Sequence, residues 1–228
     1  MFKSILNLFF PKICAGCELL LLESENIICT ECRHSAPLTN FHNYSNNEAF
    51  LKFYGRLEIE YASALLYFQK KGIVQELIHK LKYKGQQEIG ETIGYWYAEE
   101  LKKVEILKSI DYIIPVPIHK KRLKQRGYNQ VATFGDALSK SLNIPVLNLI
   151  LVRDKYTKSQ TKKNILGRNE VVDQIFSISS TTDYQNKHFL LIDDVITTGA
   201  TLESCGREVL KIHGAKLSIV CIAMTKNG

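Results

Sequence analysis

One short segment of the chain places two adjacent carboxylates between an apolar run and a loop of small and hydroxyl residues. The segment reads Leu190-Leu191-Ile192-Asp193-Asp194-Val195-Ile196-Thr197-Thr198-Gly199-Ala200-Thr201. Its apolar start predicts a buried strand over His188–Ile192, and the pattern from Ala200 to Ile212 predicts a helix. The acidic pair therefore follows directly on the expected strand, and the loop leads at once into the expected helix.

The loop before this helix suits a phosphate group. The first turn of a helix has unpaired backbone N–H groups and a partial positive charge, and both favour an anion. Gly199 lets the backbone approach the anion closely because it has no Cβ. The hydroxyls of Thr197, Thr198 and Thr201 can donate hydrogen bonds to phosphate oxygens, and Thr201 can also cap the helix.

The two carboxylates suit a ribose. Asp193 and Asp194 can accept hydrogen bonds from vicinal hydroxyls such as those of ribose, and they can hold a hydrated Mg²⁺ nearby. Together with the loop they predict a site for ribose 5-phosphate. Neither GxxxxGK[ST] nor GxGxxG occurs in the chain, so the site is neither a Walker A loop nor a dinucleotide-binding loop.

Four cysteines near the N-terminus predict a metal site. Cys14 and Cys17 form one CxxC pair, Cys29 and Cys32 form a second, and eleven residues separate the pairs. Two such turns direct four thiolates at one tetrahedral ion, which predicts a structural Zn²⁺ rather than a catalytic one. About thirty residues cannot build a core alone, so the metal would supply folding energy. A labile redox pair and an iron–sulfur site are the alternatives.

Strands and helices alternate from Tyr61 to the end of the chain. This alternation predicts an α/β domain with a mostly parallel central sheet. In such sheets ligands bind beyond the carboxyl ends of the strands, which is where the acidic pair and the threonine loop are expected. The other expected strands are Tyr61–Phe68, Asp111–Val116, Val146–Val152, Gln174–Ile178 and Lys216–Ala223, and the other expected helices are Ile73–Tyr83, Gln87–Val104 and Asn129–Leu142.

The 228 residues are expected to divide into a four-cysteine module over 1–38, a connector over 39–60 and the α/β domain over 61–228. The stretch before Pro11 predicts a short amphipathic helix rather than a signal peptide, because it has no small-residue cleavage site. No apolar run approaches the ~20 residues of a membrane span, so no stable membrane insertion is expected. Close cysteine pairs, with Cys205 and Cys221 as buried thiols, predict a cytoplasmic protein.

The charge of the chain favours anionic partners. Thirty Lys and Arg against 23 Asp and Glu give a formal net charge of +7. Two expected loops are rich in cations, the one after Val116 and the one over Arg153–Arg168. Such loops suit a pyrophosphate or a nucleic-acid backbone, and a solvated basic surface is the alternative. The cations of the first are Lys120, Lys121, Arg122, Lys124 and Arg126.

The acidic pair and the threonine loop resemble the motif that binds 5-phosphoribosyl 1-pyrophosphate (PRPP) in type I phosphoribosyltransferases. The chain as a whole resembles the ComF family of competence proteins. This resemblance implies the type I phosphoribosyltransferase fold over 61–228, with a small N-terminal zinc-binding module. The motifs that carry it are the four cysteines, Leu81-Lys82-Tyr83 before Gly85, Pro115-Val116-Pro117, Arg126-Gly127-Tyr128-Asn129-Gln130, Gln160-Thr161 with Arg168, and Phe176.

The resemblance also implies roles by position. Asp193 and Asp194 would bind the ribose hydroxyls and act in catalysis. The loop after Val116 would face the pyrophosphate, with Arg126 as its best candidate. The loop that ends at Arg168 would close over PRPP and bring cations onto the leaving pyrophosphate, which makes Arg168 a catalytic candidate. The 5′-phosphate would be bound by Thr197, Thr198, Gly199, Ala200 and Thr201.

Two hypotheses of function follow. The first is Mg²⁺-dependent transfer of a phosphoribosyl group from PRPP to an unidentified acceptor. Under this hypothesis the protein takes part in DNA uptake and can bind DNA-uptake or recombination proteins. The second is a PRPP sensor without catalysis that binds single-stranded DNA through the zinc module and Lys120, Lys121 and Lys124. The acceptor pocket would come from the zinc module and residues 50–85.

Overall fold

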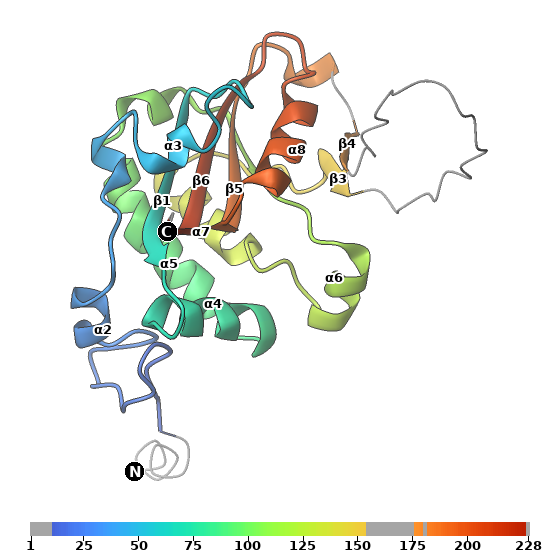
Figure 1. The fold of residues 1–228 in the computed structure, drawn as a ribbon. Helices are drawn as coiled ribbons and strands as arrows, with labels where there is room; N and C mark the ends of the chain where they lie inside the picture. Colours follow the sequence, from blue (N-terminus) through green and yellow to red (C-terminus); the bar gives the residue numbers. More distant parts are fainter. Residues whose placement is uncertain (1–10, 154–175, 180–181, 227–228) are drawn as a thin grey trace, which may run out of the picture.

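The computed structural model describes residues 11–153, 176–179 and 182–226, and within these ranges its central sheet has four parallel strands in the order β1-β6-β5-β2. A second, antiparallel pair joins β3 and β4. The predicted α/β class with a mostly parallel sheet is confirmed (Figure 1). The strands are β1 (Tyr61–Phe68), β2 (Tyr112–Pro115), β3 (Leu151–Arg153), β4 (Phe176–Ile178), β5 (His188–Ile196) and β6 (Lys216–Thr225).

Helices cover both faces of the sheet. Apolar residues of α5 recur every fourth position, at Ile89, Ile93, Tyr97 and Leu101. All four are buried in the core between this helix and the sheet. Because both faces are covered, β6 is buried at every position from Leu217 to Met224 and has no polar face. One layer consists of α4 (Ile73–Tyr83), α5 (Glu88–Leu101) and α7 (Ala132–Leu142), and the other contains α3 (Glu48–Leu51) and α8 (Ala200–Val209).

Strand β5 is longer than predicted. It continues through the acidic pair to Ile196, because β6 pairs with it as far as Met224. Strand β2, by contrast, ends beside Ile192. The expected strand Val146–Val152 is shorter: Val146 makes a single bridge to β2, and regular pairing begins at β3.

The basic stretch predicted as a loop is a helix, α6 (Lys120–Arg126). His119 Nδ1 accepts a hydrogen bond from Lys121 N at 3.1 Å and caps its start. Gly127 ends the helix with a φ of 82°. Helix α6 stands away from the sheet, on the opposite side of the molecule from the N-terminal segment drawn in blue (Figure 1).

The connector packs against β1. Thr39 N donates to Leu65 O at 3.0 Å, so the chain runs along the outer edge of this strand. The buried side chain of Asn47 donates to Ala62 O at 2.8 Å and caps α3 by accepting from Ala49 N at 2.9 Å. These contacts, with the short helix η1 (Phe41–Asn43), order a segment whose sequence indicates only turns.

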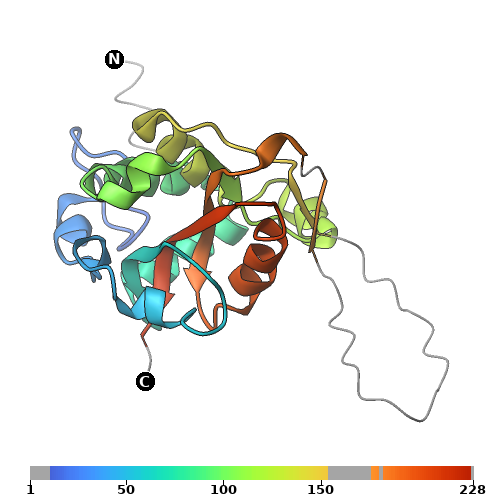
Figure 2. The ribbon, with the colours of Figure 1, turned by 90° about the horizontal axis from the view of Figure 1, so that it is seen from above.

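The cysteine module and helix α8 lie on opposite sides of the molecule when it is viewed from above (Figure 2). The short helix α2 (Thr30–His34) belongs to this module. The helix expected before Pro11 and the cationic loop from 154 to 168 lie outside the described residues. Among the helices that the structure describes, none has the length and apolar character to cross a membrane.

Candidate functional site

The carboxyl edge of the sheet brings together the turns that follow β1, β2 and β5. Because β2 stops beside Ile192 while β6 continues to Met224, the end of β5 has a strand neighbour on one side only. Side chains from α4 and from the turn before α7 contact Asp194 in this last part of β5. The acidic pair thus lies within the strand and not beyond it.

Asp194 is the centre of a chain of polar contacts. It is buried, with 4% of its surface exposed. One carboxylate oxygen accepts a hydrogen bond from Lys82 Nζ at 2.7 Å, and the other accepts from Gln130 Nε2 at 2.7 Å. Gln130 Oε1 in turn accepts from Arg126. The buried negative charge is therefore compensated by Lys82 of α4 and by Gln130 of the turn before α7, and Arg126 in turn holds Gln130.

Asp193 faces the other side of the sheet. Successive side chains of a strand alternate between its faces, so Asp194 lies on the face of Ile192, next to α4 and α7, and Asp193 on that of Leu191. Asp193 Oδ1 accepts from Asp194 N at 2.8 Å. Burial, and after it the charge of Asp194, raises the pKa of Asp193 to about 8. The two carboxylates are thus not equivalent: one is paired with a cation, and the other favours its neutral form.

The loop between β5 and α8 exposes its threonines. Gly199 has a φ of 79° and is the N-cap residue of α8, with no side-chain cap. Thr197, Thr198 and Thr201 are exposed, as is Ala200. The predicted capping role of Thr201 is wrong, because the cap position is held by a glycine whose left-handed backbone no threonine adopts readily. Thr197 and Thr198 lie in the loop just before the N-cap, and Thr201 lies in the first turn of the helix.

Connector residues hold this loop from the outside, which the sequence analysis did not predict. Lys52 Nζ donates to Thr197 O at 2.9 Å, and Arg56 Nη1 donates to Thr198 O at 3.2 Å. The buried ring of Phe53 lies 3.0 Å from where a Cβ on residue 199 would be. In the sequence, Lys52 and Arg56 stand one helical turn apart with Phe53 between them. Nothing in this pattern indicates that they contact a loop so distant along the chain.

Helix α6 divides its cations between two faces. At ~100° per residue, Arg122 and Arg126 lie on one side of the helix, and Lys120 and Lys124 on the other. The arginine side lines a cavity of about 300 Å³ that Lys82 and Tyr128 also line. The guanidinium of Arg126 lies 5.2 Å from the centre of the Tyr83 ring.

The structure therefore links Arg126 to the acidic pair, and it does not link the lysines to it. Lys120, Lys121 and Lys124 are all exposed, and they lie on the part of α6 that faces away from the cavity. Arg168, the remaining predicted site residue, lies outside the described part of the chain. Sequence analysis missed the contact partners Lys82 and Gln130 as site residues, although both stand in the motifs that carry the family resemblance.

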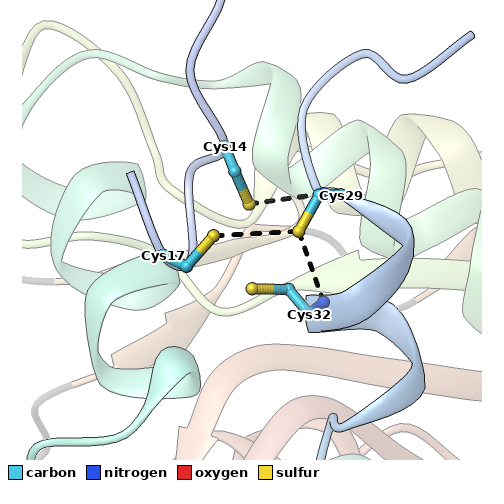
Figure 3. Close-up of side chains that lie close together, drawn as sticks. All are labelled: Cys14, Cys17, Cys29 and Cys32. Carbon is cyan, nitrogen blue, oxygen red and sulfur yellow. Dashed lines mark hydrogen bonds between the residues drawn. The ribbon is translucent and has the colours of Figure 1, made fainter. Parts of the chain in front are cut away.

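The four cysteines form a compact cluster. Their Sγ atoms lie within 4.8 Å of one another, and those of Cys17 and Cys29 are 3.7 Å apart. The four sulfur atoms point toward a common centre (Figure 3). A tetrahedral ion with Zn–S bonds of ~2.3 Å requires sulfur atoms ~3.8 Å apart, so the donor set and its spacing fit Zn²⁺.

Backbone N–H groups are directed at these sulfur atoms. Gly16 N and Cys29 N each donate to Cys14 Sγ at 3.3 Å, and Cys32 N donates to Cys29 Sγ at 3.4 Å. Burial raises the pKa of the Cys14 thiol, but the N–H groups of Cys29, Cys17 and Gly16 outweigh it and lower the pKa to about 6. They stabilise the thiolate, which is the form that binds a metal.

The cysteine module is attached to α4. A Cβ on Gly16 would lie 2.8 Å from Cγ2 of Ile73, so the module packs against the start of this helix. Near its end, Lys80 Nζ lies 2.9 Å from a carboxylate oxygen of Glu18. Helix α4 also provides Lys82, and one helix therefore contacts both the cysteine cluster and the acidic pair.

Comparisons with known proteins found similar sequences and structures. The family model "Phosphoribosyl transferase domain" matches residues 131–228, which contain the acidic pair and the threonine loop. The chain is 28% identical over 222 residues to Competence protein F of Haemophilus influenzae, covering 92% of this chain and 96% of that protein. It is 26% identical over 152 residues to DNA utilization protein YhgH of Escherichia coli O157:H7, covering 65% and 66%. The crystal structure of adenine phosphoribosyltransferase from Saccharomyces cerevisiae matches 68% of this chain and 70% of its own at 18% identity, with a TM-score of 0.35.

Proposed function

Because the chain resembles the ComF family of competence proteins and contains a match to the phosphoribosyl transferase domain, we propose that it binds PRPP and transfers the phosphoribosyl group to an acceptor during DNA uptake. The observation that carries this proposal is the contact chain from Arg126 through Gln130 and Asp194 to Lys82. It places two cations and a carboxylate beside the exposed threonine loop, as a sugar with a phosphate at each end requires.

The 5′-phosphate would lie at the loop over 197–201. The first turn of α8 offers backbone N–H groups there, and the exposed hydroxyls of Thr197, Thr198 and Thr201 offer further donors. Lys52 and Arg56 fix the loop through its carbonyl oxygens, so it needs little rearrangement to receive the anion. The 5′-phosphate would thus meet a preformed surface.

The ribose would lie over Asp194. Its hydroxyls can donate to the carboxylate and replace the hydrogen bond from Lys82, while Gln130 continues to hold the other oxygen. The released ammonium of Lys82 can then turn to the pyrophosphate, since it lines the same cavity as Arg126. The carboxylate of Asp194 also suits Mg²⁺, which when bound would neutralise pyrophosphate charge. Asp193, on the other face of the sheet, would support this site only through the backbone of Asp194.

The reaction would form a bond from an acceptor lone pair to C1 of the ribose. The bond between C1 and the pyrophosphate oxygen breaks, and its electron pair leaves with pyrophosphate. Positive charge develops on the ribose, and the negative charge of Asp194 stabilises it. Lys82 and Arg126 stabilise the leaving group, and Arg168, in the loop that the resemblance assigns to closure, would add a third cation.

The lysines of α6 support a contact with single-stranded DNA. Lys120, Lys121 and Lys124 are exposed and do not line the pyrophosphate cavity, so a strand backbone can contact them while PRPP is bound. The cysteine module lies on the opposite side of the molecule, so we assign the contact to α6 alone (Figures 1 and 2). The exposed lysines of α6 also support the second candidate function, a PRPP sensor that binds DNA without turnover.

The cysteine module would hold one structural Zn²⁺ through Cys14, Cys17, Cys29 and Cys32. The closed set of four sulfur donors supports this role, because no ligand position is left for a substrate. The protein would act in the cytoplasm, where thiols stay reduced.

Pyrophosphate release from PRPP and Mg²⁺, measured with and without a single-stranded oligonucleotide, tests the proposal. Release that depends on an added acceptor supports the transferase, and binding without any release supports the sensor. Replacing the three lysines by Gln should weaken oligonucleotide binding for every sequence and lower the salt slope by about 0.7 per lost contact. Unchanged DNA affinity and salt slope would remove the DNA role from α6.

A further inference from the structure

The last turn of α4 contacts three separate parts of the molecule through three consecutive residues. Lys80 Nζ lies 2.9 Å from a carboxylate oxygen of Glu18, in the cysteine module. The carbonyl oxygen of Leu81 accepts a hydrogen bond from the hydroxyl of Tyr128, which follows α6. Lys82 holds the buried carboxylate near the end of β5 at 2.7 Å. The turn that positions Lys82 is therefore also tied to the cysteine module.

Lys80 is a buried cation, with 8% of its surface exposed. A buried ammonium group needs a hydrogen-bonded counter-ion, and in the described part of the chain Glu18 is the carboxylate that lies within ion-pair distance. The backbone of the same lysine ends the helix, because Lys84 N donates to Lys80 O at 3.0 Å. Whatever holds Lys80 in place therefore also holds the end of α4.

Glu18 has a backbone conformation that favours glycine. Its φ is 65°, in the left-handed region that residues with a Cβ seldom adopt. The turn around it is closed by two backbone hydrogen bonds, from Cys14 N to Leu19 O at 2.8 Å and from Glu18 N to Cys14 O at 3.0 Å. A glycine here would avoid the backbone cost, but it would leave Lys80 without its counter-ion. An uncommon conformation that persists in spite of its cost indicates a role for the side chain.

The last turn of α4 is also the part of this helix that opens most easily, because the last carbonyl groups of a helix have no partner within it. Helix α4 has 11 residues, and Tyr83 beside Lys82 is exposed. If this turn opened, the ammonium of Lys82 would leave Asp194 and the cavity that it shares with Arg126. PRPP would then bind more weakly, in proportion to the fraction of molecules in which the turn is closed.

We propose that Glu18 and Lys80 are positioning residues for PRPP: they hold the last turn of α4 so that Lys82 reaches the acidic pair and the pyrophosphate. Neither residue lines the cavity beside Arg126, so both act through Lys82. The inference rests on the proposed function and adds to it two residues that do not touch the ligand. The cysteine module then contributes to PRPP binding from outside the binding site.

Replacing Glu18 by Gly separates positioning from stability. Glycine suits the left-handed backbone and offsets the loss of the ion pair, so the Tm should stay close to that of the wild type. PRPP should bind about fivefold more weakly by isothermal titration with Mg²⁺, a modest factor because the Glu18 side chain is 65% exposed and water partly replaces it. Lys80→Met should weaken PRPP binding equally, and the double variant should bind PRPP no more weakly than either single variant. The control, Lys187→Met, breaks a 3.0 Å ion pair with Asp111 and should bind PRPP as the wild type does.

Hydrogen exchange of the Lys84 amide, followed by NMR without PRPP, reports on the α4 turn by itself. It should be about fivefold faster in Glu18→Gly than in the wild type and in Lys187→Met. A wild type that does not bind PRPP would refute the proposed function, whereas the exchange rate would still test the link from Glu18 to α4. Where the wild type binds PRPP, normal affinity in Glu18→Gly would overturn the inference alone. So would a loss of affinity that a lower Tm accompanies, additive losses in the double variant, or an unchanged exchange rate.

Discussion

Replacing Lys82 by Met tests whether the buried charge of Asp194 depends on this one ammonium. The side chain of Asp194 is 6% exposed, and Lys82 Nζ lies 2.7 Å from it. Breaking a fully buried pair costs roughly 3–5 kcal/mol. Lys82 is 23% exposed, so water can partly replace it, and Gln130 remains as a donor. We therefore expect a loss of about 2 kcal/mol of unfolding free energy, on the scale of hydrogen bonds to charged groups.

Thermal unfolding followed by circular dichroism measures this loss. For a domain of this size ~2 kcal/mol corresponds to a Tm about 4–8 °C lower. Lys84→Met, at the exposed end of the same helix, is the matched control and should change the Tm by much less. Adding Asp194→Asn to Lys82→Met should recover most of the loss, because the unpaired charge is gone. Equal effects of Lys82→Met and Lys84→Met, or no recovery in the double variant, would refute the reasoning.

Three further predictions concern the metal, the second carboxylate and the phosphate loop. Wild-type protein should contain about one Zn²⁺ per chain by elemental analysis, and Cys14→Ser with Cys17→Ser should release it; metal-free wild type under reducing conditions would contradict the assignment. Because the pKa of Asp193 is raised from its ordinary value near 4 to about 8, the stabilisation from its protonated form is complete below about pH 4 and is lost as the pH rises from about 4 to about 8. The Tm of Asp193→Asn relative to wild type should therefore rise from pH 5 to pH 8, and a difference that does not vary with pH would exclude the raised pKa. Gly199→Ala should lower the unfolding free energy by about 1–3 kcal/mol and weaken PRPP binding, since a Cβ there meets Phe53 at 3.0 Å; an unchanged Tm by calorimetry would show that the loop tolerates it.

The sequence predicted the strands of the sheet well, because burial on both faces leaves continuous apolar runs such as that of β6. It ended β5 too early, at Ile192, since pairing with β6 continues through the two carboxylates and no local signal indicates such pairing. Helix α6 was missed for a different reason. None of its residues is buried, so it has no apolar period, and only the flanking His119 and Gly127 carried a signal.

The candidate site, like the fold, could be predicted only in part from the sequence. The acidic pair and the threonine loop could be predicted, because their residue types follow one another along the chain. The partners of Asp194 could not, since Lys82 and Gln130 lie 112 and 64 positions away in sequence and meet it only through the packing of α4 and α7. Lys52 is 145 positions from Thr197 and was missed for the same reason.

Isothermal titration of PRPP with Mg²⁺ into the wild type and two variants tests the central claim most directly. Asp194→Asn keeps the size of the buried side chain and removes its charge, and Asp136→Asn makes the same change at an exposed position of α7. PRPP should bind the wild type and the Asp136 variant alike, and the Asp194 variant about a hundredfold more weakly, as the loss of a charged hydrogen bond of ~2–3 kcal/mol implies. Equal PRPP affinity in all three proteins would contradict the account, because the ligand would then lie away from the carboxyl edge of the sheet.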